Sequence, residues 1–328
     1  MKIYNCTFFL IYFLISIIAC DKADNRSNEI NLGAFKVAVI LPGPKNDNSW
    51  SHAGYEAILS VQKELGTEVA YSENIKEKDF DKTIIYYAEK DFDFIISHGN
   101  QFISSLEKIA QQFPQTKFAV VGNYEGNNKN LGSLSFKNEE IAYLCGVIAA
   151  VKTKKNRISF IGGIEYENMK ELASGFSKGA LNINQGIKVS ISYIGSWDDK
   201  EKAKNIANKE IDAGSDVLAV DADSAGLIIH DIAQKKGIFT IGWVNDQYNI
   251  APGSIVTSAI QRLNVIFLEG VNIAIQGRWE GKSYRFGILE GALDIAPFRG
   301  SLSTEQEQQI INIKNEIIIG NRLIDTEK

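Results

Sequence analysis

The stretch that decides the fold is residues 35–65, FKVAVILPGPKNDNSWSHAGYEAILSVQKEL. Its first seven residues, Phe35–Leu41, form an apolar run rich in β-branched side chains, which predicts a buried strand. Residues 49–65 place apolar side chains at helical spacing, behind Asp, Asn and Ser residues of the kind that cap helices. A strand, a polar loop and a helix in this order are the repeating unit of an α/β domain with a parallel sheet.

The same alternation continues through the rest of the chain. In the first half we expect strands at 68–71, 92–97, 117–121 and 131–136 and helices at 79–90, 101–113 and 139–152. In the second half we expect strands at 158–161, 189–194, 217–220 and 239–243 and helices at 169–182, 200–213 and 225–236. The pattern is duplicated without a sequence repeat, so we predict two doubly wound, Rossmann-like lobes joined by a hinge.

The polar turn Lys152–Asn156 separates the two halves and is the predicted hinge. Further along, strand 254–258 and helix 263–276 are expected to cross back to the first lobe, and segments 284–294 and 304–316 to return to the second. The predicted first lobe therefore comprises residues 35–151 and 253–280. The predicted second lobe comprises residues 152–252 and 281–328.

The amino terminus reads MKIYNCTFFLIYFLISIIAC, in which Lys2 precedes an apolar run too short to cross a bilayer stably. The run ends at Ala19, which fits a signal-peptidase subsite, followed by Cys20, whose thiol is a lipid acceptor. This pattern predicts a signal peptide over residues 1–19, acylation of Cys20 with palmitate-type chains, and a polar tether over 20–34. We expect a lipid-anchored protein on the extracytoplasmic face of a cell membrane. The alternatives are an uncleaved transmembrane anchor and an ordinary signal peptide with an incidental cysteine.

Composition bounds the remaining classes of function. The chain has 328 residues, of which 45% are hydrophobic and 23% charged, and a formal net charge of −5. No cluster of Lys and Arg stands out, which argues against nucleic acid as a partner. Once Cys6 leaves with the signal and Cys20 carries lipid, only Cys145 remains as a thiol, so neither disulfides nor a thiolate metal site are expected. No metal-ligand spacing links the histidines, which are His52, His98 and His230.

Ligands of doubly wound sheets bind beyond the carboxyl ends of the strands. Two tryptophans, Trp50 and Trp197, lie in equivalent loops of the two halves. They suggest two facing aromatic side chains between which a flat ring could stack. Carboxylates and amides would then form hydrogen bonds with the edge of that ring. The polar residues that follow strands are Asp47, Asn48, Asp221 and Asp246. The structural alternative is that Asp residues cap helices and that tryptophans pack in cores.

Several segments, in this order, resemble the basic membrane protein family of exported lipoproteins, relatives of spirochaetal purine nucleoside receptors that serve ABC importers. The resemblance spans about residues 36–297. It is carried by Asn46–Trp50 (similar to N-D-x-S-[FW]), Phe136–Gly146 (similar to F-x-x-E-E-x-x-x-L-x-G), Phe160–Gly163 with Gly175–Phe176, Gly195–Asp199, Gly242–Gln247 and Thr257–Ser258. It implies a type I periplasmic-binding-protein fold with three crossovers, a purine held between Trp50 and Trp197, and an ABC permease with its ATPase subunits as partners.

The departures from the family pattern concern residues that would bind the ribose of a nucleoside. Nucleoside-binding relatives read G-V-D-S-D-Q where this chain has GWVNDQ, so Val244 stands where an acid would hold ribose. Gln261 replaces a usual lysine, and Asp221 lies in place of a Gly-rich turn. A purine base and a purine nucleoside both remain open, with Asp47, Asn48, Asp221, Asp246 and Gln261 as the polar ligand-binding candidates. A ligand-sensing regulatory lipoprotein is the alternative, because one branch of the family includes a regulator of competence.

An enzyme is the competing class. Val217–Ser224 resembles the strand and D-x-D motif of aspartyl phosphatases, in which Asp221 would attack phosphorus and Asp223 would assist the leaving group. The further acidic residues that such an enzyme needs to bind magnesium cannot be assigned in this sequence. Ala225 stands where that motif has Thr or Val. The sequence therefore predicts a binding protein that has no catalytic residues and needs no cofactor. A magnesium-dependent aspartyl phosphatase is the weaker alternative.

Overall fold

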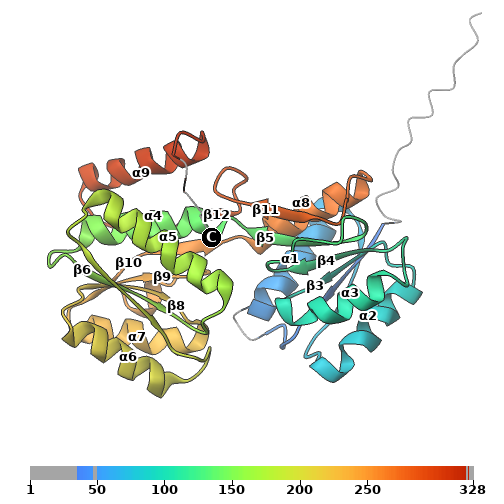
Figure 1. Cartoon of the computed structure of the whole chain (residues 1–328), viewed down its shortest axis with the longest axis horizontal. Helices are drawn as coiled ribbons and strands as arrows, with labels where there is room; N and C mark the ends of the chain where they lie inside the picture. The colour runs from blue at the N-terminus through green and yellow to red at the C-terminus, as the bar shows by residue number, and fades with distance from the viewer. Residues whose placement is uncertain (1–34, 47–49, 323, 325–328) are drawn as a thin grey trace, which may run out of the picture. The chain divides into compact units, whose positions relative to one another are not determined.

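The computed structural model describes residues 35–46, 50–322 and 324, which belong to one compact unit, residues 32–328. The predicted signal peptide, Cys20, the tether, Asp47 and Asn48 lie outside the described residues. Two six-stranded sheets, each with helices on both faces, make this an α/β protein with two parallel-sheet lobes, which confirms the predicted fold class (Figure 1). Within the described ranges, no helix combines the length and the apolar character needed to cross a membrane.

The first sheet has the strand order β11-β5-β4-β3-β1-β2 and is parallel throughout. Its strands are β1 (Lys36–Ile40), β2 (Glu68–Ser72), β3 (Phe94–Ser97), β4 (Lys117–Val121), β5 (Leu131–Phe136) and β11 (Ser283–Phe286). One face is covered by α1 (Trp50–Leu65) and α8 (Leu263–Ile275), and the other by α2 (Phe80–Glu89) and α3 (Ile103–Ala110). Because both faces are covered, the central strands are almost entirely apolar. We call this unit the first lobe.

The second sheet has the order β12-β10-β9-β8-β6-β7, with only β12 antiparallel to its neighbour. Its strands are β6 (Arg157–Gly162), β7 (Lys188–Tyr193), β8 (Val217–Asp221), β9 (Phe239–Gly242), β10 (Ile255–Gln261) and β12 (Leu293–Ile295). One face is covered by α4 (Asn138–Lys152) and α5 (Glu167–Ile183), and the other by α6 (Lys200–Asp212) and α7 (Asp223–Lys235). The last helix, α9 (Thr304–Ile318), packs on α4. We call this unit the second lobe.

The close packing of α4 against α5 explains why α4 joins the second lobe. A Cβ atom added at Gly146 would lie 1.9 Å from the Phe176 carbonyl oxygen, and one at Gly179 would lie 1.9 Å from the Tyr143 carbonyl oxygen. Glycine therefore lets the two backbones approach each other directly. The apolar side chains of α4 are buried on most sides, as its sequence NEEIAYLCGVIAAVK requires.

The chain crosses between the sheets three times, at Lys137, at Arg262 and at residues 287–292. These crossovers are hydrogen-bonded to their neighbours. The Lys137 amide donates to the Phe286 carbonyl at 2.9 Å, and the Arg262 amide donates to the Ala292 carbonyl at 2.8 Å. We call the three crossovers together the hinge.

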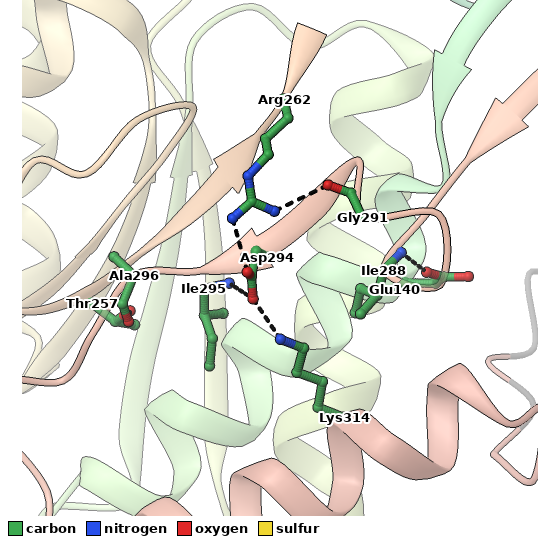
Figure 2. A network of polar contacts seen from close by, with 9 residues as sticks. All are labelled: Glu140, Thr257, Arg262, Ile288, Gly291, Asp294, Ile295, Ala296 and Lys314. Atoms are coloured by element: carbon green, nitrogen blue, oxygen red, sulfur yellow. Dashed lines mark hydrogen bonds and ion pairs between the residues drawn. The ribbon is translucent and has the colours of Figure 1, made fainter. Parts of the chain in front are cut away.

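A polar network fixes the hinge on the side of the second lobe (Figure 2). The Arg262 guanidinium donates to the Gly291 carbonyl at 3.0 Å and to Asp294 Oδ2 at 2.9 Å. Asp294 Oδ1 accepts from Lys314 Nζ of α9 at 2.5 Å, and the Ile288 amide donates to Glu140 Oε2 at 2.8 Å. The guanidinium and the ammonium together hold the pKa of Asp294 below its ordinary value, although burial of this carboxyl acts in the opposite direction.

The structure corrects four expectations about lobe boundaries. Residues 138–151, predicted for the first lobe, belong to α4, which packs on α5 in the second lobe. Within the segment 253–280 predicted for the first lobe, β10 pairs with β9 and β12 in the second sheet. Within the segment 281–328 predicted for the second lobe, β11 pairs with β5 in the first sheet. The turn Lys152–Asn156 is not the hinge, because its Lys154 and Lys155 amides donate to Asp216 Oδ2 of the same lobe. Sequence periodicity identifies a strand but does not show which sheet it joins.

Candidate functional site

The carboxyl ends of the strands in the first lobe present Trp50. Its indole is half-buried and stacks on the imidazole of His98, with ring centroids 4.2 Å apart and planes 15° from parallel. His98 follows β3 and is 0% exposed. Its Nε2 lies 2.8 Å from the Trp50 carbonyl oxygen, which only accepts, so Nε2 carries the hydrogen. Trp50 is therefore held by its ring and by its backbone.

The loop that leads to Trp50 is anchored by Lys45. The Lys45 ammonium lies over the rings of Tyr55 and Tyr71, 5.1 and 4.8 Å from their centroids. The Lys45 amide donates to Glu73 Oε2 at 2.7 Å, and the Lys45 carbonyl lies 2.8 Å from His52 Nδ1. These contacts fix the chain up to Asn46.

The second lobe presents Trp197 in the loop after β7. This indole is also half-buried, and its six-membered ring lies against Gly163, where an added Cβ would be 2.3 Å from ring carbons. The Trp197 carbonyl accepts from the Ala225 amide at 3.0 Å and from Ser224 Oγ at 3.3 Å. The other two tryptophans, Trp243 and Trp279, are buried in the core at 1% and 6% exposure. These two therefore have the ordinary structural role of a tryptophan, which is to pack in the core.

Asp221 ends β8 and is half-buried. Burial and, as the smaller cause, the neighbouring charge of Asp223 together raise the pKa of this carboxyl to about 7. The charge of Asp221 in turn helps to raise the pKa of the Cys145 thiol on α4, for which burial is the larger cause. Asp221 is therefore a carboxyl that changes its protonation near neutral pH.

Two other predicted site residues already have partners within the protein. Asp246 accepts from Arg299 Nη1 at 3.3 Å and from Nη2 at 2.5 Å, and the Arg299 guanidinium lies 4.6 Å from the Tyr248 ring centroid. Gln261 Nε2 donates to Asn138 Oδ1 at 3.1 Å. A ligand would have to replace or extend these contacts in order to reach either side chain.

The structure also shows residues that the sequence did not single out for the site. His98 and Gly163 support the two tryptophans. Gly163 lies in one of the segments that resemble the family, but nothing in the local sequence of either residue reveals its contact with a tryptophan. Gln247 holds the loop after β9, because its Oε1 accepts from the Trp243 amide at 3.2 Å and lies 3.0 Å from His230 Nε2. Burial lowers the pKa of His230 to about 4, so this histidine is neutral and structural.

Two further observations concern other kinds of site. In residues 35–46, 50–322 and 324 no three His, Cys, Asp or Glu side chains are grouped so that they could hold a metal ion. A surface hollow of about 710 Å³ lies between α9 and the end of α5, lined by residues such as Asn182, Gln309 and Asn312. It lies at the opposite end of α5 from Gly163.

Three characterised proteins are similar in sequence to most of this chain. It is 24% identical to the transcriptional activator protein Med of Bacillus subtilis, over 85% of this chain and 87% of the relative. It is 26% identical to a purine-binding protein of Brucella abortus, over 80% of this chain and 75% of that one. It is also 26% identical to basic membrane protein A of Borreliella burgdorferi, over 97% of this chain and 95% of the relative.

Solved structures show the same fold. A transcriptional activator of the comK gene from Bacillus halodurans superimposes with a TM-score of 0.78 at 22% identity, over 88% of this chain and 99% of the other. A solute-binding protein of an ABC transporter system from Aeropyrum pernix gives a TM-score of 0.76 at 19% identity, over 90% of this chain and 94% of the other. The model of the Bmp family matches residues 34–328. The chain therefore belongs to the Bmp family of PnrA-like ABC transporter substrate-binding proteins.

Proposed function

We propose that this chain is the lipid-anchored substrate-binding protein of an ABC importer and that it binds a purine base or purine nucleoside between Trp50 and Trp197. The observation that carries the proposal is the pair of half-buried indoles, one at the carboxyl-terminal edge of each sheet. Two flat apolar faces suit a flat heterocycle. The likeness to a purine-binding protein of Brucella abortus supports a purine as that heterocycle.

The polar part of the proposed site consists of Asp221, Asp246 and Gln261, with Asp47 and Asn48 beyond the described residues. Asp221 is the side chain best suited to read an exocyclic amine or ring N–H, because an ionised carboxylate accepts strong hydrogen bonds. Asp246 and Gln261 would contribute by exchanging Arg299 and Asn138 for the ligand. The closed, loaded form would then engage the permease and its ATPase subunits.

Calorimetry with free bases and their nucleosides tests the ligand directly. We expect a free base such as adenine or guanine to bind at least as tightly as its nucleoside. Val244 has no side-chain acceptor for ribose hydroxyls, and Gln261 already donates to Asn138. A nucleoside that binds about tenfold more tightly, a difference of about 1.4 kcal/mol, would show that other groups hold the sugar. Absence of binding for every purine tested would remove the proposed ligand class.

The proposed anchor has its own test. Replacing Cys20 by alanine should abolish incorporation of radiolabelled palmitate and move the mature protein from the membrane fraction to the aqueous fraction, because the lipid acceptor is lost. Cys145→Ala is the matched control, since that thiol is fully buried. Labelling that survives in Cys20→Ala would show that the processing site lies elsewhere.

A sensing role is the second candidate function. The likeness to the transcriptional activator protein Med supports it. Uptake of a labelled purine by cells with and without the gene separates the two roles. Loss of uptake supports transport, whereas unchanged uptake with altered gene expression supports sensing.

The phosphatase alternative predicts turnover at Asp221. A carboxyl whose pKa lies at about 7 is only partly ionised at neutral pH, which weakens it as a nucleophile. Phosphate esters should therefore persist when incubated with the protein and magnesium. Hydrolysis that disappears in Asp221→Asn would overturn the binding-protein proposal.

A further inference from the structure

His98 covers one face of Trp50 completely enough to exclude a ligand from that face. The two rings are 4.2 Å apart and nearly parallel, and His98 is 0% exposed. Behind His98, the edge of its ring meets Phe267 at 6.1 Å between centroids, and a Cβ at Gly54 would lie 2.8 Å from the imidazole. The imidazole has no room to withdraw. A ligand that stacks on Trp50 would therefore have to use the opposite face of the indole.

Gly163 plays the same part for Trp197. An added Cβ would lie 2.3 Å from both Cε3 and Cζ3 of the indole, far inside van der Waals contact. Gly163 does not have a positive φ, so its backbone conformation does not require glycine. Its amide donates to the Asp221 carbonyl at 2.8 Å, which fixes the backbone beneath the ring. The indole is therefore the reason that this position holds glycine.

We propose that His98 and Gly163 are the positioning residues of the ligand site, each covering one face of a tryptophan so that the other face is held ready for a flat ligand. This inference rests on the proposed function of Trp50 and Trp197. A side chain that occupies its binding rotamer for only a fraction of the time reduces the apparent affinity by that fraction. Holding the ring in advance removes this loss, which is the benefit of preorganisation.

Substitution of Gly163 tests the second lobe. In Gly163→Ala the new methyl group displaces the indole, and we expect adenine to bind about tenfold more weakly. Gly186→Ala is the matched control, because Gly186 is exposed, lies in the same lobe and has only the Asn184 side chain near an added Cβ, at 3.2 Å. If Gly163 acts through the indole, Gly163→Ala should have no further effect in a Trp197→Ala background. Additive losses would overturn the assignment.

Substitution of His98 tests the first lobe with two complementary variants. His98→Phe keeps a flat ring and loses the Nε2–H donor, whereas His98→Gln keeps a donor and loses the ring. If stacking holds Trp50, adenine affinity should fall about tenfold in His98→Gln and stay within about threefold in His98→Phe. Both effects should vanish in a Trp50→Ala background. Wild-type affinity in His98→Gln would overturn the proposal for this lobe.

A ligand-free measurement separates this inference from the proposed function. The four tryptophans can be labelled with 5-fluorotryptophan and followed by fluorine NMR, with Trp50→Phe and Trp197→Phe assigning two resonances. His98→Gln should shift or broaden the Trp50 resonance alone, and Gly163→Ala the Trp197 resonance alone. Unchanged resonances would overturn the positioning roles even if purines bind. Shifted resonances in a protein that binds no purine would support positioning and reject the ligand.

Discussion

Alanine at Trp50 or at Trp197 is expected to weaken purine binding by about 1–3 kcal/mol, which is about five- to 150-fold. Each substitution removes a stacking face and the apolar area that the ligand would cover. Stacking alone accounts for only about 0.5–1.5 kcal/mol, so the loss of buried area makes up the rest. Calorimetry measures the affinity. Purine titrations should also quench the intrinsic tryptophan fluorescence of the wild-type protein.

Tyr86→Ala provides the control for this experiment. Tyr86 is an exposed aromatic side chain, 54% accessible, on α2, which covers the face of the first sheet opposite to that of α1 and Trp50. Its loss should leave affinity unchanged. If a purine binds and neither tryptophan variant differs from wild type, the indoles are not part of the ligand site.

Asp221→Asn is expected to stabilise the ligand-free protein at pH 8 by on the order of 2–4 kcal/mol, and so to raise Tm by several degrees. The shift in pKa from 3.8 to about 7 corresponds to about 4 kcal/mol, and solvent at the half-buried Asp221 reduces this value. The folded state keeps the Asp221 proton up to about pH 7, whereas the unfolded chain releases it near the ordinary value of 3.8. Between these values the folded state binds more protons, so the wild-type protein loses stability as the pH rises. Asparagine has no such dependence. The gain should therefore be absent below about pH 4 and complete above about pH 7.

Thermal unfolding at several pH values measures this difference. Asp223→Asn is the control, because it removes the neighbouring charge but leaves the Asp221 carboxyl in place, and its effect should be smaller. Parallel curves of Tm against pH for wild type and Asp221→Asn would contradict the assignment. In the same samples, purine affinity of the wild type should rise as the pH passes about 7, because the ionised carboxylate is the acceptor, and Asp221→Asn should abolish this rise.

The secondary structure could be predicted from the sequence because each strand and helix carries its own periodicity. The run Phe35–Leu41 and the apolar spacing of 49–65 correspond to β1 and α1. The lobe to which β10 and β11 belong could not be predicted, because that choice depends on contacts between distant segments. Both strands connect at the hinge, where a few residues decide which sheet receives the next segment.

The positions of the two candidate tryptophans could be predicted from the sequence, whereas their contacts could not. Trp50 and Trp197 follow strands, and the structure leaves both of them half-buried. The support of Trp50 by His98 joins residues 48 positions apart, and the pairing of Asp246 with Arg299 joins residues 53 positions apart. No local pattern encodes such pairs. Arg299 in particular looks like an ordinary surface residue in the sequence, yet it determines whether Asp246 is available to a ligand.

The strand β10 belongs to the second sheet, whereas β11, which follows it in the chain, belongs to the first. This arrangement also limits the order in which the protein can fold. The edge strand β11 pairs with β5, and Ser283 lies 150 positions after its partner Ser133. A growing chain that has reached β10 therefore still lacks a strand and a helix of its first lobe. Contacts of such long range slow folding, since the loop must close before they form. The first sheet cannot be completed until residue 286 has emerged, and the second sheet cannot be completed until residue 295 has emerged, so both are finished almost together, late in synthesis.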